Sequence, residues 1–323
     1  MIRLILDLLN FLNLLGSAVQ VIPLPGIPMA IHPLDRGVAV ACIDRSVICI
    51  ADTGYTVDVL PYKVLEPRDI CLWNGELAAA DFSGESIVIN NRMILLPGGP
   101  DRICEVFWNT PSAPELAVAL FNPGIIVLVD QDGTVSTLVK MPGAKSISPC
   151  DVDGDGDMDL FASGFGSGVI CIENRDLLPV VHYIGTIEVG VKRCFAVDMD
   201  DDSLMDVAGI ACAEGGAGWW RNPGCNDGEW EFHEIDRYLK GPKDIWCRGD
   251  SIVIASLFSD TFVSFIPGVQ FPEGFLCCYI SDEGDIILGH RLGFLIHIRE
   301  GALRISACSG FPIIRNFLTQ LIM

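Results

Sequence analysis

The stretch LFASGFGSGVICIENRD at residues 160–176 contains two short apolar runs separated by a glycine-rich turn and closed by polar residues. Apolar runs of this length, bounded by Gly, Asn and Asp, are typical of β-strands. The second run with its closing turn recurs along the chain in seven copies: SVICIADTG (46–54), SIVINNR (86–92), IIVLVDQDG (125–133), VICIENRD (169–176), GWWRNPG (218–224), FVSFIPG (262–268) and FLIHIREG (294–301). Self-similarity at such a spacing indicates an array of like structural units.

Each unit has room for four strands. A strand with small residues, such as LAVALFNPG, precedes every copy, and a strand such as TVSTLVKMPG follows most of them. A further strand, such as DRICEVFW, comes before these three. The unit is about 33 to 51 residues long, which is the range of four-stranded propeller blades. No helix of ordinary length fits between the strands, so a βαβ architecture is excluded. We therefore predict an all-β fold, a seven-bladed β-propeller of four-stranded blades.

The domain boundaries follow from this repeat. The predicted blades are residues 28–66, 67–99, 100–143, 144–190, 191–241, 242–274 and 275–309. The propeller thus covers 28–309, between an N-terminal helix or strand segment (1–27) and a C-terminal apolar tail (310–323). Within residues 1–18 the polar side chains recur every three or four residues, which predicts an amphipathic helix packed on the propeller. A membrane-surface or partner-docking helix is the alternative, and one of the two ends could supply a closing strand.

Composition limits the classes of function. The chain has 323 residues, is 50% hydrophobic and carries a net charge of −21, so it is neither disordered nor suited to nucleic acid. No apolar run reaches the ~18 residues of a membrane span. The 13 cysteines lie largely in strand-like runs without a CxxC pair. This pattern favours free thiols in a reducing compartment, hence the cytoplasm over a secreted or cell-surface location, with a disulfide-rich intracellular protein as the alternative.

A calcium-binding pattern occurs in the fourth predicted blade, in the loop DVDGDGDMD (151–159). Carboxylates occupy positions 1, 3, 5 and 9 of this loop, and position 7 can offer a backbone carbonyl. These residues are Asp151, Asp153, Asp155, Asp159 and, at position 7, Asp157. Glycine at positions 4 and 6 lets the backbone curl, and several hard oxygens around one point suit Ca²⁺. Position 12 is an alanine within a strand, so the loop is not an EF-hand.

The fifth predicted blade repeats the spacing in DMDDDSLMD (198–206). Its expected ligands are Asp198, Asp200, Asp202, Asp206 and the carbonyl of Leu204. Ser203 replaces the glycine at position 6. The alternative for both loops is a solvated acidic turn, in which clustered carboxylates would repel one another. We predict two Ca²⁺ sites.

These two blades resemble a known repeat family. DxDGDGxxDL followed by a strand, and GWWRNPG followed by WEFHEID, are similar to FG-GAP/VCBS-type repeats, over residues 144–241. The resemblance implies a seven-bladed propeller, as in integrin α-subunit heads, with Ca²⁺ between the first and second strands of a blade. Elsewhere the pattern fades, since NTPSAPE stands where the third blade would carry an acidic loop. The fold hosts binding modules and a few lyases, so no single function follows.

Basic residues recur where the first strand of a blade begins. They occupy this place in five consecutive units: Arg68, Arg102, Lys145, Lys192 with Arg193, and Lys243. First strands line the channel of a propeller, so these residues are expected at one mouth, where they could hold an anion or an acidic partner. The alternative is that each forms a salt bridge to a neighbouring blade, as Asp69, Asp101 and Asp244 suggest. Lys145 has no acid in its own strand start, GAKSIS.

The loops after the second strands are expected to face the same mouth. Four of them have a phenylalanine in matched positions, Phe82, Phe121, Phe165 and Phe258, which we interpret as wedges between blades. His290 and Arg291 occupy this place in the last unit. The sequence thus favours a non-catalytic binding or scaffold propeller with a protein partner or a small anionic or carbohydrate ligand. The alternative is a carbohydrate lyase or dehydratase, for which His290 is the one candidate base.

Overall fold

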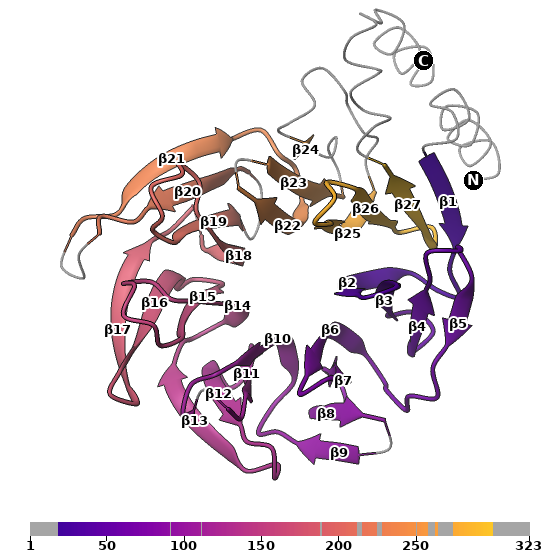
Figure 1. Cartoon of the computed structure of the whole chain (residues 1–323), viewed down its shortest axis with the longest axis horizontal. Coiled ribbons are helices and arrows are strands. Elements are labelled where there is room, and N and C mark those ends of the chain that lie inside the picture. The colour runs from indigo at the N-terminus through magenta and orange to yellow at the C-terminus, as the bar shows by residue number, and fades with distance from the viewer. Residues whose placement is uncertain are drawn as a thin grey trace, which may run out of the picture.

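The computed structural model describes residues 19–90, 92–110, 112–187, 189–211, 215–224, 228–249, 251–257, 262–263 and 274–299. In these residues the chain is all β, with antiparallel sheets arranged radially around a central axis (Figure 1). The predicted helix in residues 1–18, the tail 310–323 and Phe258 lie outside the described residues.

Each sheet runs outward from an inner strand at the channel. The inner strands are β2 (Pro28–Leu34), β6 (Pro67–Trp73), β10 (Pro100–Val106), β14 (Ala144–Cys150), β18 (Val191–Val197), β22 (Pro242–Arg248) and β25 (Phe275–Ile280). The second strands are β3 (Gly37–Cys42), β7 (Glu76–Asp81), β11 (Glu115–Leu120), β15 (Asp159–Gly164), β19 (Asp206–Ala211), β23 (Ser251–Ser256) and β26 (Ile286–His290).

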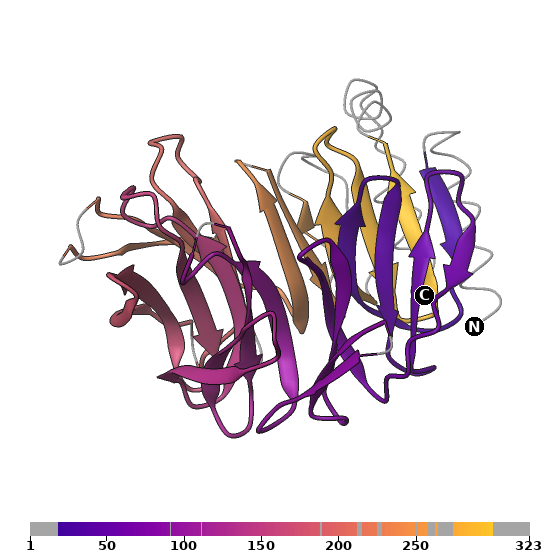
Figure 2. The same cartoon turned by 60° about the horizontal axis from the view of Figure 1, so that its bottom comes forward.

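The third strands contain the repeated run from which the fold was predicted. They are β4 (Val47–Ala51), β8 (Ser86–Ile89), β12 (Ile125–Val129), β16 (Gly168–Arg175), β20 (Ala217–Arg221), β24 (Phe262–Val263) and β27 (Phe294–Ile298). The outer strands are β5 (Val57–Val59), β9 (Arg92–Leu95), β13 (Val135–Lys140), β17 (Leu178–Gly185), β21 (Glu231–Asp236) and β1 (Val19–Pro23). Figure 2 shows the sheets from the side, standing next to one another around the axis.

The prediction of seven four-stranded blades is wrong. Six blades are four-stranded, whereas β22, β23 and β24 form a sheet of three strands in the described residues. Strand β24 pairs with β23 over only two residue pairs.

The N-terminal segment closes the circle of sheets. Strand β1 pairs antiparallel with β27 from Val19↔Ile298 to Pro23↔Phe294, so it forms the outer strand of the sheet that contains β25. A terminal segment was expected to be able to do this, and residues 19–23 take that place. Joining the two ends of the propeller in one sheet leaves no gap between the first and last sheets.

Apolar side chains fill the interfaces between neighbouring sheets. Ile87 and Leu116 are fully buried between the β6–β9 and β10–β13 sheets. Phe161 packs with Trp220 between the β14–β17 and β18–β21 sheets. Small residues make this close packing possible, since Ala78, Ala79 and Ala80 of β7 are all fully buried. The inner strands are thereby held rigidly around the channel.

Candidate functional site

A β-bulge recurs at the start of every inner strand. The register with the second strand shifts by one residue between the first and third positions, for example between Ala144 and Ser146 in β14. The bulged residues are Met29, Arg68, Asp101, Lys145, Lys192, Lys243 and Leu276. A bulge leaves one residue unpaired and redirects its side chain. It therefore places four of the six predicted basic residues at one mouth of the channel, which we call the basic mouth.

Three lysines converge there. Lys145, Lys192 and Lys243 come from the adjacent inner strands β14, β18 and β22, and Lys243 lies within hydrogen-bonding reach of Lys192. Burial, followed by the like charges of Lys243 and Lys145, lowers the pKa of Lys192 to about 7. Asp101 is the carboxylate that counters this charge, and its Oδ2 accepts a hydrogen bond from Lys145 Nζ at 2.8 Å. Lys145 thus has an acidic partner in the neighbouring sheet, although its own strand start, GAKSIS, contains no acid.

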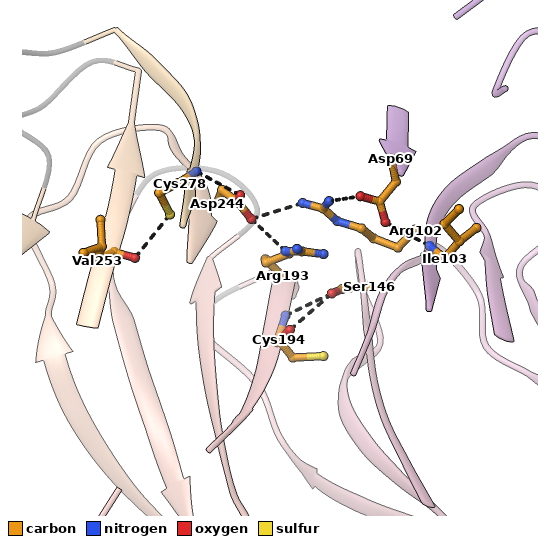
Figure 3. Close-up of polar contacts among 9 residues, drawn as sticks. All are labelled: Asp69, Arg102, Ile103, Ser146, Arg193, Cys194, Asp244, Val253 and Cys278. Carbon is orange, nitrogen blue, oxygen red and sulfur yellow. Dashed lines mark hydrogen bonds and ion pairs between the residues drawn. The ribbon is translucent and has the colours of Figure 1, made fainter. Parts of the chain in front are cut away.

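Two of the three arginines of the predicted ring, Arg102 and Arg193, form ion pairs with carboxylates of other inner strands (Figure 3). Arg102 donates to Asp69 Oδ1 at 2.5 Å on the neighbouring β6 and to Asp244 Oδ1 at 3.1 Å on the distant β22. Arg193 Nε donates to the same Asp244 oxygen at 2.7 Å. Burial opposes the charge of Arg102, but Asp69 and Asp244 offset this effect, so the pKa of Arg102 is raised. The four side chains cross the channel with two positive and two negative charges, and we call them the channel network.

Side chains of one inner strand also cap the backbone edge of the next. Asp69 Oδ2 accepts the Ile103 N–H at 3.0 Å, and Asp244 Oδ2 accepts the Cys278 N–H at 3.2 Å (Figure 3). Ser146 Oγ accepts the Cys194 N–H at 3.3 Å in the same way. Inner strands face the channel with an unpaired edge, and buried backbone donors need partners. These contacts supply partners and fix the spacing of neighbouring sheets.

The last predicted member of the ring, Arg68, is paired within its own sheet. Arg68 pairs with Glu66, and its guanidinium lies 4.4 Å from the centre of the Phe82 ring. Phe121 lies in the same way beneath Lys145, with 4.4 Å between the amine and the ring centre. The phenylalanines that were expected to be wedges between blades therefore support cations in two cases. A third phenylalanine of this set, Phe165, is 51% exposed.

His290 is packed among aromatic side chains. Its side chain is 3% exposed, stacked on Phe294 at 4.6 Å and edge-on to Phe275 at 5.0 Å. Its Nδ1 accepts the Leu292 N–H at 3.2 Å, which tightens the turn after β26. Arg291 is exposed and donates its backbone N–H to Gly274 O at 2.9 Å. The position that raised the enzyme alternative is thus packed into the protein.

The acidic loop 151–159 connects β14 to β15 at the opposite mouth. Asp151, Asp153 and Asp159 each place a carboxylate oxygen within 4.8 Å of the others. Gly154 and Gly156 both have positive φ, 77° and 94°, as the predicted curl requires. The Oδ1 atom of Asp157 is buried without a hydrogen-bond partner among the described residues, although position 7 was expected to offer its carbonyl. Burial raises the pKa of Asp159 to about 6. The donor set and its unpaired oxygen fit a hard divalent cation.

The loop 198–206 has the same backbone but a different environment. Asp201 and Ser203 adopt positive φ at the positions of the two glycines, 59° and 70°, and Asp198, Asp200 and Asp206 cluster within 4.8 Å. Here Arg221 Nε lies 2.7 Å from Asp200 Oδ2, and its Nη2 lies 3.0 Å from Asp202 Oδ2. The matched position of the first loop holds Glu173, which contacts Arg175 and His182 instead. Only the second loop, among the described residues, has a guanidinium resting on its carboxylates.

Comparison with known proteins supports the fold. No protein-family model matches the sequence, and no curated protein matches it, so the resemblance to FG-GAP/VCBS-type repeats is supported only at the level of the β-propeller. Virginiamycin B lyase from Staphylococcus aureus has a similar structure, with a TM-score of 0.68 at 14% identity, covering 87% of this chain and 98% of that chain.

Binding propellers are similar to almost the same degree. The WD40 propeller domain of Doa1 has a TM-score of 0.63 at 10% identity, covering 86% of this chain and 94% of its own. YCF48 from Cyanidioschyzon merolae has a TM-score of 0.62 at 14% identity, covering 88% of this chain and 99% of its own. A structure of YCF48 bound to D1 peptide matches as well. At such identities the likeness shows the fold alone, and it includes both a lyase and binding proteins. No helix in the described part of the chain has the length and apolar character needed to cross a membrane.

Proposed function

We propose that this protein is a non-catalytic binding propeller that holds an anionic group, a carboxylate or a phosphate, at the basic mouth. The observation that carries the proposal is the convergence of Lys145, Lys192 and Lys243 around one carboxylate, Asp101. Neither Lys192 nor Lys243 forms an ion pair with a carboxylate of the described residues. When all three amines are protonated they face a single carboxylate, on a protein whose net charge is −21.

An anion at this place relieves an unfavourable arrangement. Partly buried amines repel one another, and Lys192 responds by releasing its proton near neutral pH. A bound anion stabilises the protonated form of Lys192, so binding is coupled to proton uptake above pH 7. The channel network lies beneath the lysines, and we expect a small anion or the tip of an acidic polypeptide segment as the ligand.

Isothermal titration calorimetry with inorganic phosphate and with acetyl-Gly-Glu-Glu-Gly-amide tests the proposal and separates the two sources. Lys192→Met should weaken binding at least about tenfold, because a hydrogen bond to a charged group contributes about 1.5–3 kcal/mol. Lys140→Met, on the outer strand β13, is the matched control and should leave affinity unchanged. At pH 8 the observed heat should depend on the buffer, which reports proton uptake. Equal affinity in both variants, or no binding of either probe, refutes the proposal.

We also propose that Ca²⁺ binds the loop 151–159 and stabilises the fold, as FG-GAP-type loops do. Its clustered carboxylates and the buried, unpaired oxygen of Asp157 support this assignment. The loop 198–206 offers a similar set, but Arg221 already neutralises part of its charge, so we expect weaker calcium binding there. Thermal unfolding with calcium and with a chelator tests this, and identical midpoints refute it.

A further inference from the structure

A large cavity lies at the channel mouth opposite the lysines. It has a volume of about 790 Å³ and is bordered by the ends of the inner strands β2, β22 and β25 and by the turns that follow them. Volumes of this size hold drug-sized ligands. We call it the acidic cavity, because five of its lining residues are carboxylates, Asp35, Asp52, Asp282, Glu283 and Asp285, against the single arginine Arg248.

Aromatic rings form part of its wall. Trp246 and Tyr279 occupy equivalent positions on β22 and β25 and meet edge to face, with ring centres 5.0 Å apart. Trp246 also contacts Phe195 of β18, with ring centres 4.9 Å apart. Trp246 and Tyr279 are both only partly buried, so some of their surface is available to a ligand. The faces of tryptophan and tyrosine rings attract cations.

The opposite wall combines acids with a second aromatic group. His297 Nε2 lies 2.8 Å from Asp285 Oδ2, and the His297 ring lies 5.9 Å from that of Tyr55. Arg299 donates an Nη2–H to the hydroxyl of the lining residue Tyr55 at 3.0 Å. Asp52 Oδ1 accepts the Thr56 N–H at 2.7 Å, and this bond fixes the carboxylate in place. The field in the cavity is therefore negative and its surfaces are flat and aromatic.

From this combination we infer that the acidic cavity binds an organic cation, an ammonium or guanidinium group, stacked on Trp246 and Tyr279 and neutralised by the surrounding carboxylates. A metal ion is a poor match, because aromatic walls supply no ligands for a hard cation. The cation can come from a free small molecule or from an arginine side chain of a polypeptide. The site is separate from the basic mouth, since the channel network lies between them, and the inference does not depend on the function proposed above.

Calorimetric titration of the full-length protein with two guanidinium probes tests the inference. Agmatine represents the free small cation, and acetyl-Gly-Arg-Gly-amide represents a polypeptide arginine. The same peptide with citrulline has the shape of the arginine peptide without the charge and should bind at least tenfold more weakly. Tighter binding of agmatine than of the arginine peptide assigns the site to a small molecule, and the reverse order assigns it to a polypeptide.

Isosteric variants locate the binding. Asp52→Asn combined with Glu283→Gln removes two charges from the cavity and should weaken the better probe at least tenfold, while asparagine can still accept the Thr56 N–H. Asp58→Asn combined with Asp176→Asn removes two exposed charges outside the cavity and should change affinity less than twofold. Trp246→Phe should weaken binding about fivefold. The inference is overturned if neither probe binds, if citrulline binds equally well, or if both double variants lose the same affinity.

Discussion

Asp244 is the residue on which the channel network depends most directly. It is 3% exposed and accepts from Arg102, from Arg193 and from the backbone of Cys278. In Asp244→Asn the amide oxygen can still accept the Cys278 N–H, but an NH2 group then replaces the oxygen that accepts from Arg102 and Arg193, so the charge and both hydrogen bonds to the arginines are lost. Asp69 then remains as a partner for Arg102, and Arg193 has no counter-charge left within the network. Removing one partner of a buried ion pair costs about 3–5 kcal/mol, and we expect a loss in this range.

Equilibrium unfolding in urea, followed by circular dichroism and by tryptophan fluorescence, measures this loss. The midpoint should fall while the slope of the transition stays unchanged, because a change of midpoint alone reports stability. Asp282→Asn is the matched control, since Asp282 is 99% exposed and lies 3.9 Å from Arg248, and it should cost less than about 1 kcal/mol. In an Arg193→Gln background Asp244→Asn should cost clearly less. A loss as small as that of the control would show that the network contributes no more than a surface ion pair.

Three further predictions follow from the lysines and the acidic loops. Lys192→Met should stabilise the protein most at and below pH 7, where the charged amine is buried, and the gain should vanish towards pH 10. The reason is that the pKa of Lys192 in the folded state, about 7, lies below its value in the unfolded chain, so the penalty falls by at most about 1.4 kcal/mol per pH unit between them. A gain that does not change between pH 6 and 10, measured by urea titration, contradicts this. Arg221→Gln should increase the calcium-dependent shift in melting temperature, because the loop 198–206 loses the guanidinium that neutralises its carboxylates. Asp153→Asn should reduce that shift. Equal shifts in both variants would count against the assignment. Ser203→Gly should raise the free energy of unfolding by about 0.5–1 kcal/mol, since φ is 70° there, and an unchanged midpoint would disprove the strain.

Much of the architecture follows from local patterns in the sequence. Short strands bounded by Gly, Asn and Asp recur in units of about 33 to 51 residues, and the β-propeller prediction rests on that repeat. The number of strands in a blade is a different matter. Strand β24 pairs over two residues, and a sequence such as FVSFIPG resembles the other third strands without showing how much of it pairs. Pairing is decided by hydrogen-bond partners distant in sequence, which a local pattern does not contain.

Among the functional residues, too, local patterns predicted some features, whereas others depend on contacts distant in sequence. The shared strand starts indicated that basic residues gather at one mouth, but not that Arg102 would reach β22, 142 residues away in sequence, while three lysines remain together. The bulge that places the three lysines at the mouth depends on the register of two strands. The acidic cavity was missed altogether, because its acids and aromatics come from different sheets. One available signal was the alignment of Phe195, Trp246 and Tyr279 at the fifth position of successive inner strands.

Strand β22 connects the three charged regions of the molecule. Lys243 faces the basic mouth, Asp244 belongs to the channel network, and Trp246 borders the acidic cavity. A ligand that displaces Lys243 therefore acts on a strand whose position is fixed by Asp244 and whose other end shapes the second site. The channel network lies between the two mouths, and β22 offers one continuous path for coupling between them. Linkage then requires that an anion at the basic mouth changes the affinity for a cation by the same factor as the cation changes the affinity for the anion.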